Sequence, residues 1–194
     1  MEAAAELCAE GGYEALGENQ IAERAGLPVA KFRECFPGGE EQCLAEGENA
    51  ILLEVVAAVS RSYSADQSEW ESVTRGVKAI LELMAENPAF AYLGYVAARQ
   101  MAPGRAREMY ESGHRMLEAM LERGGEYSGD RQQPPTTALG ILGGAEAIIR
   151  RELVAGRAGE LPRILTECVY AAFVPYLGQE EALRLAREGE RLGR

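Results

Sequence analysis

The stretch from Gly17 to Phe36 constrains the fold of this chain more than any other. Its apolar spacing predicts a short helix, a turn at Gly26 and a second short helix, which is the helix-turn-helix pattern. Gly26 suits the turn because glycine accepts a left-handed backbone, and Ala22 is small where the two helices would cross. We expect Leu27 and Phe32 to hold the second helix against the first. The exposed side of that helix would then enter a DNA major groove.

The rest of the chain predicts an all-α protein, because apolar residues recur at helical spacing throughout. Ser68 and Glu71 form a capping box at the start of one of these helices. The expected helices cover residues 2–11, 40–63, 68–87, 89–101, 105–123, 136–155, 161–176 and 180–191. No apolar run is long enough to cross a bilayer and there is no signal peptide. We therefore expect a soluble, cytoplasmic protein with no membrane contact.

The charge of the chain conflicts with DNA binding. The formal net charge is -11, and residues 1–50 contain eleven Glu against only Arg24, Lys31 and Arg33 as cations, which leaves -8 for this segment. Because nonspecific DNA affinity comes largely from cations that release phosphate counterions, we expect weak binding that is confined to low salt. Three explanations stay open: the carboxylates, Glu48 among them, form solvated faces turned away from DNA; DNA binding has been lost; or a basic arm precedes Met1.

Three segments around the helix-turn-helix resemble the N-terminal domain of the tetracycline-repressor (TetR) family of transcriptional regulators. They are AAAELCAEGGY at 3–13, IAERAGL at 21–27 and CFPGGEEQCL at 35–44, and weaker similarity returns in GRAGELPRILTE and VPYLG near the C-terminus. The resemblance implies an N-terminal three-helix domain over 1–46 that binds DNA. It also implies that a long helix leads into a larger helical domain over 47–194 that binds a small-molecule effector and dimerises.

The chain departs from the family pattern at positions that matter for DNA. Leu16 and Gly17 stand where a Thr or Ser caps the second helix, Glu18 replaces a buried aliphatic residue, Arg33 replaces a phosphate-contacting Tyr, Cys35 replaces a His and Gly39 replaces a frequent Lys. Arg33 keeps a cation able to hold a phosphate. The other changes remove hydrogen-bond donors and a charge.

The predicted DNA-binding residues lie on the two helices of the helix-turn-helix. We expect Lys31 and Arg33 to contact phosphates or bases, Val29 and Ala30 to face the floor of the groove, and the remaining residues to lie beside the DNA backbone or at the start of the second helix. The full predicted set is Asn19, Gln20, Arg24, Pro28, Val29, Ala30, Lys31 and Arg33.

Aromatic and methionine residues concentrate in the middle of the chain, where the family places its effector pocket. Such a lining suits a small, mostly apolar ligand, with Arg99 or His114 as an orienting polar contact. The alternative is that these residues fill the core. The predicted ligand-binding set is Trp70, Phe90, Tyr92, Tyr95, Arg99, Met109, Tyr110 and His114.

The helices at about 136–156 and 160–177 are expected to form a homodimer, because the resemblance implies a four-helix bundle between two subunits. Gly140, Gly143 and Gly144 each weaken an isolated helix by roughly 1 kcal/mol, and close approach of another backbone would compensate for this. The alternative is a hairpin within one chain.

The sequence offers little for catalysis or cofactor binding. His114 is the single histidine, phosphate-binding loops are absent, and the four cysteines lack the spacing of a metal site, so we expect them to be small buried side chains. We therefore expect no metal, no cofactor and no enzyme activity. The favoured hypothesis is a TetR-like repressor that an apolar effector releases from a double-stranded DNA operator. The alternatives are a TetR-like ligand-binding dimer without DNA binding and, less favoured, an all-α enzyme.

Overall fold

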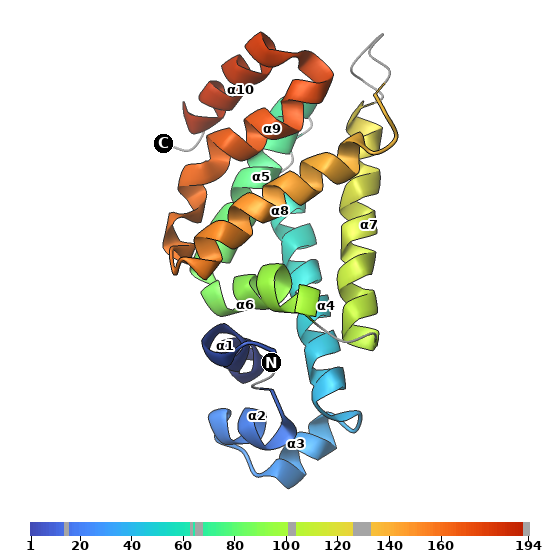
Figure 1. Cartoon of the computed structure of the whole chain (residues 1–194), viewed down its shortest axis with the longest axis vertical. Coiled ribbons are helices and arrows are strands. Elements are labelled where there is room, and N and C mark those ends of the chain that lie inside the picture. Colours follow the sequence, from blue (N-terminus) through green and yellow to red (C-terminus); the bar gives the residue numbers. More distant parts are fainter. Residues whose placement is uncertain (14–15, 63, 65–67, 101–103, 126–132, 192–194) are drawn as a thin grey trace. The chain divides into compact units, whose positions relative to one another are not determined.

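The computed structural model describes residues 1–13, 16–62, 64, 68–100, 104–125 and 133–191, and every regular element in this part is a helix (Figure 1). The all-α prediction is therefore confirmed. The α-helices are α1 (Glu2–Gly11), α2 (Glu18–Arg24), α3 (Val29–Cys35), α4 (Gly39–Ser62), α5 (Glu69–Glu86), α6 (Pro88–Tyr92), α7 (Arg105–Gly125), α8 (Thr137–Val154), α9 (Leu165–Leu177) and α10 (Gln179–Arg191). Within the described residues no helix is both long and apolar enough to span a membrane.

The helices form two compact units. The first comprises Met1–Glu54 and Asn87–Gly113, and the second comprises Val55–Glu86 together with the chain from His114 onward. Helices α4 and α7 each contribute one part to each unit. The first unit runs past residue 46 and also includes a later segment of the chain, so it does not correspond to the expected DNA-binding domain over 1–46. The domain boundary expected at residue 46 therefore stays a prediction.

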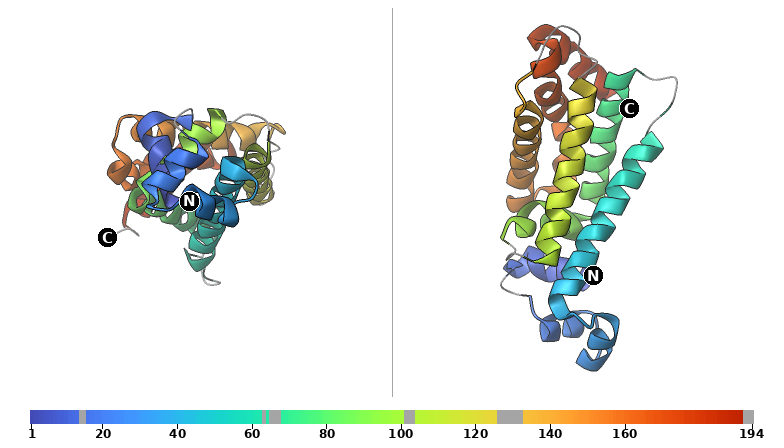
Figure 2. Two further views of the ribbon diagram at one scale, coloured as in Figure 1. Left: turned by 90° about the horizontal axis from the view of Figure 1, so that it is seen from below. Right: turned by 90° about the vertical axis from the view of Figure 1, so that its right-hand side faces the viewer.

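The core of the first unit collects apolar side chains from α1, α2, α3 and α4. Helix α2 packs against α1 and α3, and the helix-turn-helix lies beside the N-terminal end of α4 (Figure 2). Ala22 and Phe32 are buried, and Gly26 has a φ of 67°, as the sequence predicted. Leu27 is instead 45% exposed, because it follows the turn and precedes α3, where no helical face directs it inward. Phe36 packs against the core beside Phe32, and the centroids of the two rings are 5.2 Å apart.

The segment expected to be one helix over 89–101 is irregular. Helix α6 passes at Leu93 into a π-helical turn, η2 (Leu93–Ala97), and then into a 3₁₀ turn, η3 (Ala98–Gln100); Met101 lies outside the described residues. The segment is buried on several sides, since α6 packs against α1 and side chains such as Ala91, Leu93 and Val96 are covered. A run of apolar residues indicates burial, but it does not distinguish an α-helix from the wider π turn.

The second unit is built on α9, which packs against α10, α5 and α8. Apolar residues at helical spacing on α9, among them Val169 and Phe173, are buried. The beginning of the expected helix is instead a 3₁₀ segment, η4 (Ala158–Ile164), which contains Pro162. The α-helix begins only at Leu165, and the 3₁₀ segment leads into it, as is frequent at the N-terminus of an α-helix.

The predicted capping box at the start of α5 is confirmed. The backbone N–H of Ser68 donates to the Glu71 carboxylate at 2.9 Å, and the backbone N–H of Glu71 donates to Oγ of Ser68 at 3.2 Å. Both hydrogen bonds satisfy amide groups that the first turn of a helix leaves without partners.

Candidate functional site

Helix α3 is positioned to present one side to solvent. The backbone N–H of Leu27 donates to the carbonyl of Ala22 at 2.9 Å, and that of Phe32 donates to the carbonyl of Pro28 at 3.1 Å, which fixes the turn and the start of α3. With Phe32 buried on the inner side, Ala30 lies on the outer side as predicted. Val29, which was expected to face the floor of the groove, instead packs against the core, because it lies three residues before Phe32 on the same side of α3. Asn19, Gln20, Arg24, Pro28, Ala30, Lys31 and Arg33 are exposed, and Val29 is half-buried.

All three cations of the first fifty residues are paired with carboxylates. The most tightly held is Arg24, whose Nη1 donates to Glu6 at 3.3 Å and to Glu10 at 2.9 Å, while its Nη2 donates to Glu10 at 2.5 Å. The hydrogen bonds from Arg24 lower the pKa of the Glu10 carboxyl. These bonds tie α2 to α1 and occupy both terminal amino groups of Arg24, a residue that the sequence placed beside DNA.

Lys31 is paired more loosely. Its Nζ lies 2.9 Å from the carboxylate of Glu34, one turn further along α3, and both side chains are more than half exposed. An exposed ion pair of this kind contributes roughly 0–1 kcal/mol. Lys31 can therefore exchange its carboxylate partner for a phosphate at little cost.

Arg33 makes a third kind of contact. Its Nε donates to Oε2 of Glu18 at 2.6 Å, which connects α3 to the first residue of α2. The Arg33 side chain is 65% exposed, whereas that of Glu18 is only 25% exposed. Glu18, which stands where the family that the sequence resembles has an aliphatic residue, thus lies in a partly covered position and forms an ion pair with Arg33.

The carboxylate partners of these cations were not part of the predicted site. The Lys31–Glu34 pair follows from a spacing of three residues on one helix and could have been found in the sequence. The other partners, Glu6, Glu10 and Glu18, lie far from their arginines in the chain, and only the packing of α1, α2 and α3 brings them together.

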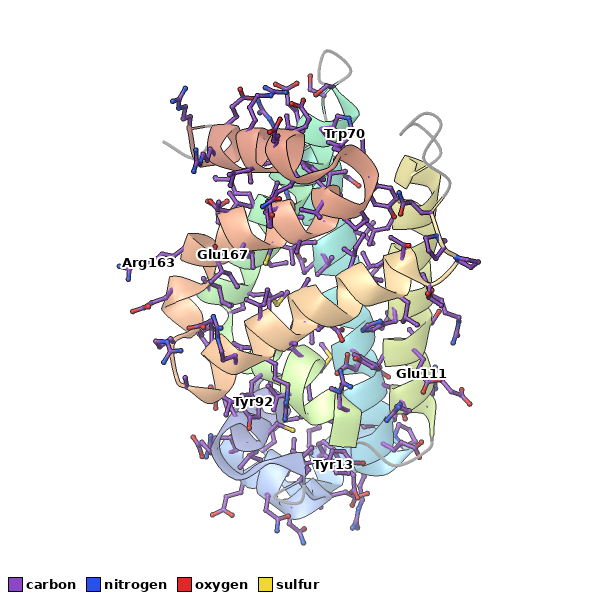
Figure 3. The ribbon with its side chains drawn as sticks, turned by 45° about the horizontal axis from the view of Figure 1, so that its top comes forward. Tyr13, Trp70, Tyr92, Glu111, Arg163 and Glu167 are labelled. Atoms are coloured by element: carbon purple, nitrogen blue, oxygen red, sulfur yellow. The ribbon has the colours of Figure 1, made fainter. Side chains whose placement is uncertain are left out.

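The predicted effector residues divide between the two units. Six of the eight lie in the first unit: Phe90 and Tyr92 on α6, Tyr95 on η2, Arg99 on η3, and Met109 and Tyr110 on α7. Of these, Phe90, Met109 and Tyr110 pack against the core of that unit. Tyr92 lies on α6, the helix that packs against α1 (Figure 3). All except the exposed Arg99 are half-buried.

Trp70 and His114 belong to the second unit. Trp70 on α5 meets Phe173 of α9 edge to face, with ring centroids 4.9 Å apart. Nε2 of His114 on α7 contacts a carboxylate oxygen of Glu146 on α8, and both side chains are largely buried. Each of these residues therefore has a packing or charge partner within its own unit.

Glu48 on α4 contradicts the expectation of a solvated face. It is 6% exposed, and its Oε1 has no hydrogen-bond partner among the residues that the structure describes. Burial raises the pKa of the Glu48 carboxyl to about 7. The pKa of the buried Cys8 thiol is raised to about 12 by burial and, to a smaller extent, by the charge of Glu48. Glu48 lies four residues after the buried Leu44 and seven before the buried Val55, on the apolar face of α4, so helical periodicity could have predicted its burial.

The cysteines follow the prediction with one exception. Cys8, Cys43 and Cys168 are buried, but Cys35 at the end of α3 is exposed because it lies on the outer side of that helix. Among the residues that the structure describes, no group of three or more His, Cys, Asp or Glu side chains is placed to hold a metal ion.

Comparison with known proteins gives matches only in structure. No family model matches the chain, and no curated protein matches it. The fatty acid degradation regulator FadR from Bacillus halodurans aligns with a TM-score of 0.74 at 16% identity, over 90% of this chain and 95% of FadR. The TetR-family regulator PfmR from Thermus thermophilus aligns with a TM-score of 0.61 at 22% identity, over 98% and 96% of the two chains.

A third similar structure is a tetR-family regulatory protein from Rhodococcus, with a TM-score of 0.56 at 18% identity, over 98% of this chain and 92% of that protein. The alignments cover nearly the whole of each chain, so they include both the helix-turn-helix and the later helices. At these identities the comparisons establish the fold, which is the one that the sequence resemblance implied.

Proposed function

We propose that this chain, which has the fold of TetR-family transcriptional regulators, is itself a regulator that binds double-stranded DNA through α3. The observation that carries the proposal is the outward face of α3, where Lys31 and Arg33 stand more than half exposed on a helix whose other side is anchored by Phe32. In the proposed complex this face of α3 would enter the major groove, where the two cations would meet phosphates or base edges.

The proposed mode of action is repression in the cytoplasm, with the operator released when an effector binds. Helix α4 contributes Gly39–Glu54 to the unit that carries the helix-turn-helix and the remainder to the second unit. An effector that binds one conformation of α4 more tightly would shift the population between DNA-binding and released states. Such a shift requires no contact between the effector and DNA.

A homodimer through the helices at 136–156 and 160–177 is part of the proposal. On α8, side chains added to Gly140, Gly143 or Gly144 would meet nothing within 4 Å, and Leu139 and Val154 are more than half exposed. No neighbour in the described part of the chain uses the space that these glycines leave. A second α8 packed against this face would bury the two apolar side chains and offset the helix-weakening effect of the glycines. Arg163 and Glu167 on the adjoining η4 and α9 are exposed and supply polar groups beside it (Figure 3).

The proposed effector is small and mostly apolar. Phe90, Tyr92, Tyr95, Met109 and Tyr110 in the first unit are half-buried aromatic and methionine side chains, a composition that suits such a ligand, and the exposed Arg99 lies on the same segment as Tyr92 and Tyr95. Because FadR is described as a regulator of fatty acid degradation, a series of fatty acids is the first set of ligands to test. Trp70 of the second unit provides the fluorescence reporter, and His114 remains a predicted contact there.

One observation favours a second candidate function, a ligand-binding dimer that no longer binds DNA. Arg24, Lys31 and Arg33 are all paired with carboxylates, in a segment whose formal charge is -8. A surface of this kind releases few phosphate counterions when it meets DNA.

Fluorescence anisotropy separates the two candidates. Labelled duplexes selected from a random-sequence library are titrated with the full chain across a series of salt concentrations. A regulator is expected to bind a selected duplex specifically, and Lys31→Ala should weaken binding to all sequences and reduce the salt slope by about 1 for each phosphate that is no longer neutralised. If no duplex is selected from the library and the anisotropy does not change with salt concentration, the regulator is excluded and the ligand-binding dimer remains.

A further inference from the structure

We propose that Glu18 is a positioning residue that holds the guanidinium group of Arg33 in place for a DNA phosphate. The inference rests on the proposed function, since it assumes that α3 faces DNA. It concerns a residue outside the predicted DNA-binding set. Glu18 itself carries the wrong charge to touch a phosphate, and so it acts through Arg33.

The hydrogen bond between the two residues uses only one edge of the guanidinium. Nε of Arg33 donates to Oε2 of Glu18 at 2.6 Å, and the hydrogen bonds described for Arg33 include none from its two Nη groups. Guanidinium is a rigid, planar fork of five N–H donors, so fixing the Nε edge also fixes the direction of both Nη groups. These are the donors that bind an anion in a bidentate manner.

The exposure of the two side chains agrees with a positioning role for Glu18 and a phosphate-contacting role for Arg33. Glu18 is 25% exposed and thus held by its surroundings, whereas Arg33 is 65% exposed and open to a ligand. Arg24 shows the contrasting arrangement, because both of its Nη groups already donate to the carboxylate of Glu10. Glu10 therefore occupies both Nη groups of Arg24, whereas Glu18 orients Arg33 through its Nε alone.

The start of α4 contributes to the position of Glu18. A Cβ atom added to Gly39 would lie 2.8 Å from Oε1 of Glu18, closer than real Cβ contacts allow. Glycine at this position therefore leaves the space in which the carboxylate lies. The carboxylate of Glu18 on α2 thus lies between the space beside Gly39 on α4 and the guanidinium group of Arg33 on α3.

A selected duplex in which single phosphates are replaced in turn by uncharged methylphosphonates tests the inference. For the wild-type chain, we expect one replacement in each half-site to weaken binding about tenfold, which is typical of losing a hydrogen bond to a charged group. Arg33→Ala and Glu18→Leu should bind the native and the modified duplex about equally. Glu18→Gln should keep the sensitivity, because the amide oxygen still accepts the Nε–H. Glu23→Gln on the exposed side of α2 is the matched control and should behave as wild type.

Several results would overturn the inference. Glu18→Leu could retain the wild-type sensitivity, which would mean that Arg33 needs no positioning. It could bind more tightly and become more sensitive, which would make Glu18 a competitor of the phosphate. If Glu18→Leu does not fold, as judged by circular dichroism, Gly39→Ala displaces the same carboxylate and is expected to lose the same sensitivity. Failure of the wild-type chain to bind any duplex would instead refute the proposed function, and the inference with it.

Discussion

A Cβ atom added to Gly39 would lie 2.8 Å from Oε1 of Glu18, and Gly39 has a φ of 69°. Gly39→Ala is therefore expected to carry two costs. The left-handed backbone costs an alanine about 1–2 kcal/mol, and displacement of the Glu18 carboxylate strains its bond to Arg33. Urea denaturation should show a lower free energy of unfolding.

Gly26→Ala separates the two costs in this experiment. Gly26 has nearly the same φ, 67°, but an added Cβ would meet nothing within 4 Å. Gly39→Ala should therefore destabilise the protein more than Gly26→Ala, by up to about 1 kcal/mol, the range for a partly exposed ion pair. Equal destabilisation would show that the Glu18 carboxylate moves aside freely.

The buried carboxyl of Glu48 is expected to make stability depend on pH. Its pKa in the folded protein is raised from 4.5 to about 7, so between these values the folded state binds a proton that the unfolded state has lost. Stability should therefore be highest, with respect to this group, below pH 4.5, and should fall as pH rises through about 7. The full change corresponds to about 3 kcal/mol.

Glu48→Gln isolates this contribution, because the glutamine cannot ionise. The difference in unfolding free energy between the variant and wild type should move in favour of the variant as pH rises from 4.5 to 8. Glu54→Gln, at an exposed position on the same helix, should show no such trend. A Glu48→Gln difference that is constant with pH would mean that Glu48 titrates normally in the folded protein.

Cys35 should be the thiol that reacts first in the native protein. Burial raises the pKa of Cys8 to about 12 and that of Cys168 to about 11, and it also raises the pKa of Cys43, so these three thiols are both covered and poorly ionised. Cys35 is exposed at the end of α3. Titration with a disulfide reagent at pH 8 should give one fast thiol, and Cys35→Ser should abolish it. Fast reaction of two or more thiols would show that α1, α4 or α9 opens readily.

The helix-turn-helix, the capping box at Ser68 and most helix ranges could be predicted from local patterns, because apolar spacing, a turn glycine and a cap are short-range signals. The burial of Glu48 also follows a local pattern, because Glu48 shares one face of α4 with Leu44 and Val55. The π turn after Tyr92 could not be predicted in this way, since it depends on packing between distant segments. The same holds for the charge partners of the candidate site. Glu18, Arg33 and Gly39 were three separate departures from a family pattern in the sequence, and only the fold shows that Arg33 bonds to Glu18 and that a side chain at position 39 would meet the same carboxylate.

The outer face of α8 provides the test of dimerisation. Leu139 is 52% exposed and Val154 is 59% exposed, and in the proposed dimer both would be covered by a second subunit. Leu139→Glu and Val154→Glu should each place a charge in that interface and shift the protein toward monomer at micromolar concentration, as measured by light scattering. Leu53→Glu is the matched control, because Leu53 is 60% exposed on α4, outside the proposed interface. It should leave the mass unchanged. If the wild-type chain is already a monomer at these concentrations, the glycines of α8 have no compensating neighbour, and Gly144→Ala should then raise the free energy of unfolding by roughly 1 kcal/mol through helix propensity alone.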